Sequence, residues 1–120
     1  CTDCHNPHGG GDGMLARDTI RDTCGRCHAE QLGPFAFDHA DTMEDCGGCH
    51  EVHGSINDNL LKMTEPMLCM QCHSGHFTNN ISGPNSVEAK AAFFTRCTDC
   101  HSSIHGTDLP APSGNGTFTR

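Results

Sequence analysis

The sequence has few of the residues from which a protein core is usually built. Its 120 residues contain no tryptophan and no tyrosine, and leucine, isoleucine, valine and phenylalanine together number only 18. No apolar run reaches the roughly 18 residues that a membrane-spanning helix needs. Basic residues are also scarce, since 7 lysines and arginines face 15 aspartates and glutamates, which argues against a nucleic-acid partner. This composition is typical of a disordered chain unless another group supplies apolar surface.

What the chain has instead is cysteine, ten residues in all, and each belongs to a Cys-x-x-Cys-His motif. In this spacing the two thiols form thioethers with a porphyrin, and the adjacent imidazole faces the iron as its proximal ligand. The motifs therefore predict five covalent haems c. The attachment residues are Cys1 and Cys4, Cys24 and Cys27, Cys46 and Cys49, Cys69 and Cys72, and Cys97 and Cys100, followed by the proximal ligands His5, His28, His50, His73 and His101.

Other uses of paired cysteines explain this pattern less well. An even number of cysteines in a short acidic chain is typical of a disulfide framework, but disulfides do not require a histidine after each second cysteine. Zinc ribbons use Cys-x-x-Cys pairs, yet four-ligand sites would not need five identical units and five further histidines. A thioredoxin-like redox pair would occur once, in a βαβ context that this sequence lacks. Haem attachment is therefore the preferred interpretation.

The five remaining histidines equal the number of distal axial positions that five haems offer. They are His8, His39, His53, His76 and His105. Methionine is the rival distal ligand, because the chain also has five methionines, at Met14, Met43, Met63, Met67 and Met70. A methionine among apolar neighbours more often fills a core. We therefore expect five irons with two histidine ligands each.

The spacing of these histidines restricts which iron each can reach. His8, His53 and His76 follow a proximal histidine by three residues, and His105 follows His101 by four, so the backbone holds them on the proximal side of the local haem. We expect these four to ligate haems attached to other motifs. His39 lies eleven residues from the proximal histidines on either side of it, and we expect it to serve the haem on Cys46 and Cys49.

The fold expected from this pattern is a multihaem cytochrome with little regular secondary structure. Loops would wrap a closely packed chain of haems, with essentially no β-sheet and a few short α-helices that end in the motifs. The helices are predicted at residues 18–28, 65–73 and 86–101. Since the side chains alone supply little apolar surface, folding should depend on haem insertion, as small metal domains depend on their metal.

An internal repeat predicts the organisation of the chain. Residues 1–28 and 46–73 align without a gap, which pairs Leu15 with Leu60 and Arg17 with Lys62. The expected arrangement is a single pentahaem domain over residues 1–108, followed by an extended tail over 109–120. Its 45-residue repeat, which carries two haems, comprises residues 1–45, residues 46–90 and a partial third copy from residue 97.

The cellular location also follows from the predicted cofactor. Covalent haem attachment takes place outside the cytoplasmic membrane, so we expect a periplasmic or extracellular protein. The sequence starts on a motif cysteine and contains no leader with a charged region followed by an apolar one, so we expect a processed or trimmed chain.

Several segments resemble the decahaem cytochromes of the DmsE and MtrA type. They are Gly33-Pro-Phe-Ala-Phe-Asp-His39, Glu44-Asp-Cys-Gly-Gly-Cys-His50, His53-Gly-Ser, Leu60-Leu-Lys62, Leu68-Cys-Met-Gln-Cys-His73 and Ile104-His-Gly106. The resemblance covers essentially the whole chain and is to the five-haem C-terminal half of such proteins, and more loosely to pentahaem donors such as NrfB. It implies a chain of closely spaced haems that carries electrons through the periplasm or, inside a porin, across the outer membrane.

Two functions are compatible with this pattern. Irons with two histidine ligands have no position for a substrate, so the first is electron transfer without enzyme activity. Its partners would be other redox proteins, either cytochromes or terminal reductases, with further copies of the chain in a filament or an outer-membrane porin as neighbours. The alternative is a multihaem reductase with one open haem site, which requires a vacant coordination position.

Overall fold

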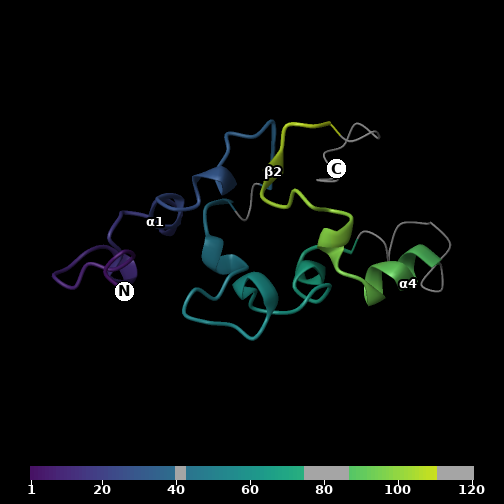
Figure 1. The fold of residues 1–120 in the computed structure, drawn as a ribbon, viewed down its shortest axis with the longest axis horizontal. Coiled ribbons are helices and arrows are strands. Elements are labelled where there is room, and N and C mark those ends of the chain that lie inside the picture. The colour runs from purple at the N-terminus through teal and green to yellow at the C-terminus, as the bar shows by residue number, and fades with distance from the viewer. Residues whose placement is uncertain (40–42, 75–86, 111–120) are drawn as a thin grey trace. The chain divides into compact units, whose positions relative to one another are not determined.

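Regular secondary structure is sparse in the computed structural model, which describes residues 1–39, 43–74 and 87–110 (Figure 1). The α-helices of the described part are α1 (Ile20–Gly25) and α4 (Val87–Phe94). Single turns of 3-10 helix are η1 (Asp12–Met14), η2 (Ala29–Gln31), η3 (Cys46–Gly48), η4 (Asp58–Leu60), η5 (Cys69–Gln71) and η6 (Cys97–Asp99). The strands are β1 (Phe37–Asp38) and β2 (Gly106–Thr107).

Helix α1 begins where Thr19 caps it. The Thr19 side chain accepts a hydrogen bond from the Asp22 amide at 3.0 Å, and its hydroxyl donates to the Asp22 carboxylate at 2.7 Å. Such a cap satisfies one of the amides that a helix start leaves without an intrahelical partner. The helix predicted over residues 18–28 is therefore shorter than expected, because it starts after its cap and its last turn tightens: Cys27 N–H donates to the Cys24 carbonyl, three residues back.

The other two predicted helices were also too long. Over residues 65–73 the structure has turns followed by the single turn η5, because its last turn tightens: the amides of Gln71 and Cys72 donate to carbonyls three residues back. Over residues 86–101 the α-helix α4 ends at Phe94, and a separate turn, η6, forms the motif. In η6 the Asp99 carboxylate accepts a hydrogen bond from the Arg96 amide at 3.2 Å, which starts a new turn at that point.

A short antiparallel ribbon joins β1 to β2, with Phe37 opposite Thr107 and Asp38 opposite Gly106. Two-residue strands are too short to show an alternating pattern, so no sequence pattern indicates them. The ribbon continues beyond the strands, since Ala36 N–H donates to the Asp108 carboxylate at 2.9 Å. Segments 70 residues apart in sequence are held together here.

Protein side chains form almost no core of their own. Among the side chains whose burial is described, the buried apolar ones are Met43, at 8% exposure, and Pro66, and no large side chain is fully buried. Thr23 and Thr107 are the buried polar residues of this part. The expected fold class, a multihaem cytochrome of loops and short helices with only a minimal sheet, is confirmed.

The chain divides into two compact units. The first comprises Cys1–Gly48 with the segment that starts at Ile104, and the second comprises Cys49–Ser103. The segment after the last motif therefore belongs with the N-terminal part, through β1 and β2. That residues 1–108 act as one pentahaem domain, with a tail over 109–120, stays a prediction.

Candidate cofactor sites

The motif spacing places its three functional side chains on one side of a helical turn. Residues at positions i, i+3 and i+4 of a turn project from the same face. In four motifs the histidine N–H donates to the carbonyl of the first cysteine at 2.8 to 3.0 Å, and the second cysteine's N–H approaches the same carbonyl at 3.1 to 3.3 Å. These motifs begin at Cys1, Cys24, Cys69 and Cys97. Each such turn can present two thiols and one imidazole to a single ligand.

Two proximal histidines have their rings held by backbone carbonyls. Nδ1 of His5 lies 2.9 Å from the Gly13 carbonyl oxygen, and Nδ1 of His50 lies 2.8 Å from that of Asn59. A carbonyl oxygen can only accept, so Nδ1 carries the proton and Nε2 keeps its lone pair for a metal. Hydrogen bonds of this kind orient the histidine ligands of metal sites. This arrangement fits the predicted role of both residues as iron ligands.

The turns that supply these carbonyls share one backbone conformation. Gly13 and Met14 have φ values of 68° and 56°, and Asn59 and Leu60 have values of 53° and 56°. Positive φ is unfavourable for residues other than glycine and is found where the surroundings enforce it. Both turns, of which only the first contains a glycine, lie beside a proximal histidine and hold its ring.

The two loops correspond with an offset of one residue from the ungapped alignment. His5 forms an isolated β-bridge with Leu15, and His50 forms the equivalent bridge with Leu61. A constant offset of 45 residues would instead pair His50 with Leu60. The flanking hydrogen bonds shift in the same way, from Ala16 N–H to the Cys4 carbonyl and from Lys62 N–H to the Cys49 carbonyl. The second loop therefore contains one extra residue, which the sequence comparison did not detect.

In the first unit, the cysteine Cys24 lies between two other motifs. Its thiol is hydrogen-bonded to Cys46, the first cysteine of the following motif, and it also interacts with Cys4 of the preceding one. Burial raises the pKa of the Cys24 thiol to about 11, and the neighbouring thiols add to this increase. The Arg26 guanidinium, within the same motif, donates to the Asp3 carbonyl at 2.8 Å and ties the second motif to the first.

The second unit repeats this arrangement around Cys69. Its thiol is hydrogen-bonded to Cys97 of the following motif and interacts with Cys49 of the preceding one. Burial raises the pKa of the Cys69 thiol to about 12, followed in importance by Cys97 and then by the Glu65 carboxylate. A carboxylate oxygen of Glu65 and the Sγ atoms of Cys69 and Cys97 all lie within 4.8 Å of one another.

The expected distal histidines fall into distinct surroundings. His8 and His53 are exposed, each followed by a glycine with φ of 126° or 136°. His39 and His105 are half-buried. Each lies next to the Asp38–Gly106 pair of β1 and β2, so the strand register places their backbones opposite each other. His76 lies outside the described residues. Among the proximal histidines, His28 lies beside an acidic group, with its Nδ1 atom 3.6 Å from the Glu30 carboxylate.

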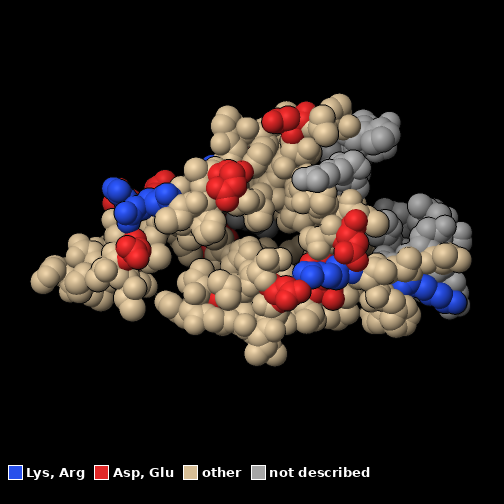
Figure 2. All heavy atoms as spheres, in the orientation of Figure 1, with Lys and Arg blue, Asp and Glu red and all other residues tan. Residues whose placement is uncertain are grey.

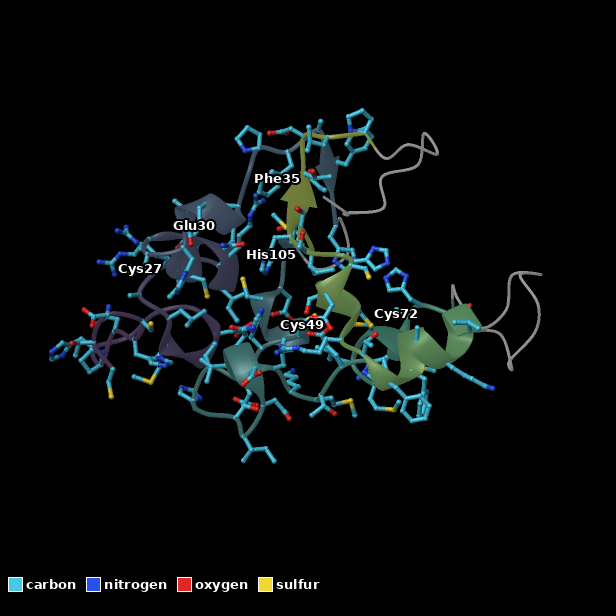
Figure 3. All side chains as sticks on the ribbon, turned by 45° about the vertical axis from the view of Figure 1, so that its right-hand side comes forward. Cys27, Glu30, Phe35, Cys49, Cys72 and His105 are labelled. Carbon is cyan, nitrogen blue, oxygen red and sulfur yellow. The ribbon has the colours of Figure 1, made fainter. Side chains whose placement is uncertain are left out.

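The ribbon that carries His105 depends on an aromatic ring packed against a glycine. Gly106 is buried with φ of 158°, and a Cβ at this position would lie 2.5 Å from Cγ and 2.9 Å from Cβ of Phe35. Figure 3 shows Phe35 beside β2, near His105 at the start of that strand. Only glycine therefore fits at position 106.

The rival methionine ligands have less specific surroundings. Met43 is buried, whereas Met14, Met63, Met67 and Met70 are 38 to 48% exposed. The sulfur of Met63 lies 2.8 Å from the Gln71 side-chain nitrogen, which donates to it.

Some charged side chains of the described part form opposite pairs. In the view of Figure 2, basic groups lie beside acidic ones in places, while other acidic groups stand alone. Arg96 lies 2.8 Å from Asp58, and Arg21 lies 3.5 Å from Glu44. Hydrogen bonding to its own backbone amide and to Gln31 lowers the pKa of Glu30. Among the helices of the described residues, none has the length and apolar character needed to cross a membrane.

Comparison with known proteins agrees with this geometry. The profile of a family described as a doubled CXXCH motif matches residues 1–33 and 39–77, which include four of the five motifs. The chain belongs to this family of multihaem c-type cytochromes. The cytochrome is also similar to the multiheme cytochrome MtrA of Shewanella baltica (strain OS185), with 43% identity over 119 residues. That alignment covers 92% of this chain but only 36% of MtrA, so the cytochrome spans about a third of its relative's length.

The residues of the cytochrome suit covalent haem c. The motif turns bring thiols and imidazole to one side, two proximal rings have Nε2 directed away from their carbonyl partners, and the polypeptide has little apolar packing of its own. Sequence reasoning identified these groups but missed Glu65, Arg96, Thr98 and Arg26, which fix one motif against another. The sequence contains one sign of the role of Glu65. It lies 45 residues after Ile20, so the second copy of the repeat has a charged residue where the first copy has an apolar one.

Proposed function

We propose that this cytochrome carries five haems c, each with two histidine axial ligands, and relays electrons between redox proteins. Bound haem c supplies an iron that exchanges one electron at a time. The polypeptide holds the attachment points close together, orients the ligands and sets the charge around each site.

The order of the attachment residues in space is the observation that carries the proposal. Cys24 interacts with a cysteine of the motif before it and with one of the motif after it, and Cys69 does the same in the second unit. Each unit therefore places a middle motif between its two sequence neighbours. Cofactors attached in this order would be adjacent from the first motif to the third and from the third to the fifth. Adjacency of this kind is what a relay requires.

The placement of the fifth distal histidine supports ligation between motifs. His105 lies only four residues after His101, yet it belongs to the first unit, whereas Cys97–His101 belongs to the second. This separation favours our prediction that His105 serves a haem attached to another motif. Its neighbour across the ribbon, His39, remains our candidate for the haem on Cys46 and Cys49.

With all ten histidines on iron, no coordination position is left for a substrate. We therefore propose that the cytochrome is not an enzyme. The alternative, a multihaem reductase, would require one of the five distal histidines to stay off its iron.

The setting of the relay is proposed from the family and from haem chemistry. We place it in the periplasm or outside the cell, where covalent haem attachment occurs. Its proposed partners are other cytochromes or terminal reductases. Further copies of the chain, or an outer-membrane porin, are candidate neighbours that could extend the path of a chain about a third as long as MtrA.

Low-temperature EPR of the oxidised protein tests the proposal, with spins counted against total haem iron. We expect five low-spin irons per chain and a mass that corresponds to five covalent haems. A high-spin signal from about one iron in five would contradict complete histidine ligation and favour the reductase.

Two variants make this test specific to the distal ligands. His105→Ala should convert one of the five irons to a high-spin or altered low-spin form, because its sixth ligand is lost. Met63→Leu is the matched control, since it removes a rival sulfur ligand and should leave all five signals unchanged. A change in the methionine variant instead would contradict the assignment.

A further inference from the structure

The two units differ at one position of the 45-residue repeat. In each unit the residue at this position contacts the next motif along the chain, but its side chain is apolar in the first unit and acidic in the second. In the first unit Ile20 packs against η3: a Cβ on Gly47 would lie 3.4 Å from Ile20 Cδ1. In the second unit, 45 residues later, Glu65 meets Thr98 of η6. Gly47 and Thr98 both directly follow the first cysteine of their motif. An apolar contact in one unit is thus replaced by a carboxylate in the other.

The Glu65 carboxylate is firmly held. Its side chain is only 3% exposed. Oε2 accepts the Thr98 amide at 2.8 Å, and the Thr98 hydroxyl donates to both carboxylate oxygens at 3.0 and 3.1 Å. The Arg96 guanidinium lies 3.5 Å away. These bonds fix the start of η6, and with it Cys97, against Cys69.

The network around Glu65 carries one net negative charge. Arg96 is closer to Asp58, at 2.8 Å, than to Glu65, at 3.5 Å, so its single positive charge is shared between two carboxylates. Arg96 and Asp58 are 44% and 76% exposed, so water screens their charges more than that of Glu65. The nearest counterpart in the first unit, Asp45 beside Cys46, is exposed and therefore better screened. Glu65 is the less screened of the two carboxylates.

This buried charge lies directly beside two haem attachment points. Because the carboxylate oxygen is within 4.8 Å of the Sγ atoms of both Cys69 and Cys97, the thioethers formed there would both feel it. A negative charge near a haem disfavours the added electron, and local charge is one of the means by which a protein sets haem potentials.

We propose that Glu65 is a positioning and tuning residue that locks the fourth and fifth motifs together and lowers the reduction potentials of their two haems relative to those of the second and third. The inference rests on the proposed five-haem relay and adds an electrostatic difference between its two ends. Electrons would reside preferentially on haems of the first unit, and the pair beside Glu65 would be oxidised first.

Potentiometric titration of the holoprotein, followed by EPR and optical spectra, tests this proposal. Glu65→Gln keeps the shape of the side chain but removes its charge, so the potentials of two haems should rise and the other three should stay unchanged. Ile20→Val is the matched control at the equivalent apolar position and should shift none. Equal potentials in Glu65→Gln and wild type, or a uniform shift of all five, would overturn the proposal.

A second variant keeps the test decisive if Glu65→Gln loads haem poorly. Arg96→Gln removes the positive charge beside Glu65, so the same two potentials should fall instead of rise. No change in this variant, or a rise, would count against the proposal. The haem content and spin count of the wild-type protein establish the five-haem relay independently, so failure of the tuning role can be told from failure of the proposed function.

Discussion

Replacing Gly106 by alanine should open the β1–β2 ribbon. The new Cβ would lie 2.5 Å from Cγ and 2.9 Å from Cβ of Phe35, closer than side-chain atoms can approach, and the φ of 158° is one that residues with a side chain rarely adopt. Either the ring must move or the strand must leave its partner. The second response separates Asp38 from Gly106, and either one loosens the packing of the segments that carry His39 and His105.

The magnitude can be worked out from two contributions. Overpacking of a filled space costs about 1–3 kcal/mol. Forcing a side chain into an unfavourable backbone region costs a further 1–3 kcal/mol, roughly. Together they predict a loss of about 2–6 kcal/mol, which is large for a two-strand ribbon that is marginal without its surroundings.

Hydrogen exchange of the ribbon amides in the holoprotein measures this loss as a local opening free energy. Gly54→Ala is the matched control, because Gly54 has a φ of 136° but no atom within 4 Å of an added Cβ, so only the backbone contribution remains. Combining Gly106→Ala with Phe35→Ala removes the clash and should restore part of the protection that Gly106→Ala loses.

Two outcomes would refute this reasoning. If Gly106→Ala and Gly54→Ala accelerate local exchange equally, the ring of Phe35 does not limit the space at Gly106. If the double variant exchanges as fast as the sum of the single effects predicts, the two residues are not coupled across the ribbon.

Further predictions concern the cap of α1 and the haem-free chain. Thr19→Ala should remove the cap and cost about 1 kcal/mol, measured as faster exchange of amides in α1, whereas Thr19→Ser should keep most of the protection; equal effects of the two changes would argue against the cap. Without haem the chain should be unstructured, so the thiols of Cys24 and Cys69 should be alkylated with an ordinary pKa near 9.0. A folded haem-free chain would instead keep the Cys24 thiol protonated until about pH 11 and the Cys69 thiol until about pH 12. Because folding raises both pKa values, the contribution of these thiols to folding stability would be fully present below pH 9.0 and lost as the pH rises through about 11 and 12.

The cofactor sites were predictable because their chemistry is local. A haem imposes the spacing of two thiols and one imidazole whatever the surrounding fold, so Cys24, Cys27 and His28 could be assigned from three positions alone. The lack of a core was predictable for a similar reason, since composition limits it directly. Met43 and Pro66 are the buried apolar side chains of the part that the structure describes.

Long-range contacts and exact helix limits were not predictable. The pairing of Asp38 with Gly106 joins residues 68 positions apart and involves strands too short to leave a periodic pattern. The partner of Glu65 is Thr98, 33 residues away, and no local pattern indicates such a contact. The one-residue shift between the loops after His5 and His50 escaped alignment, because the motifs at both ends keep a constant spacing.

The contribution of a C-terminal segment to the N-terminal unit has a consequence for the order of maturation. In Figure 1 the strand β2, late in the chain, pairs with a segment that precedes the third motif. A polypeptide that is synthesised and exported from its N-terminus delivers Cys49–Ser103, an uninterrupted stretch, before Ile104 emerges. The second unit can therefore mature while the first still waits for its final strand. Of the two units, the one that begins first along the chain is the last to be completed.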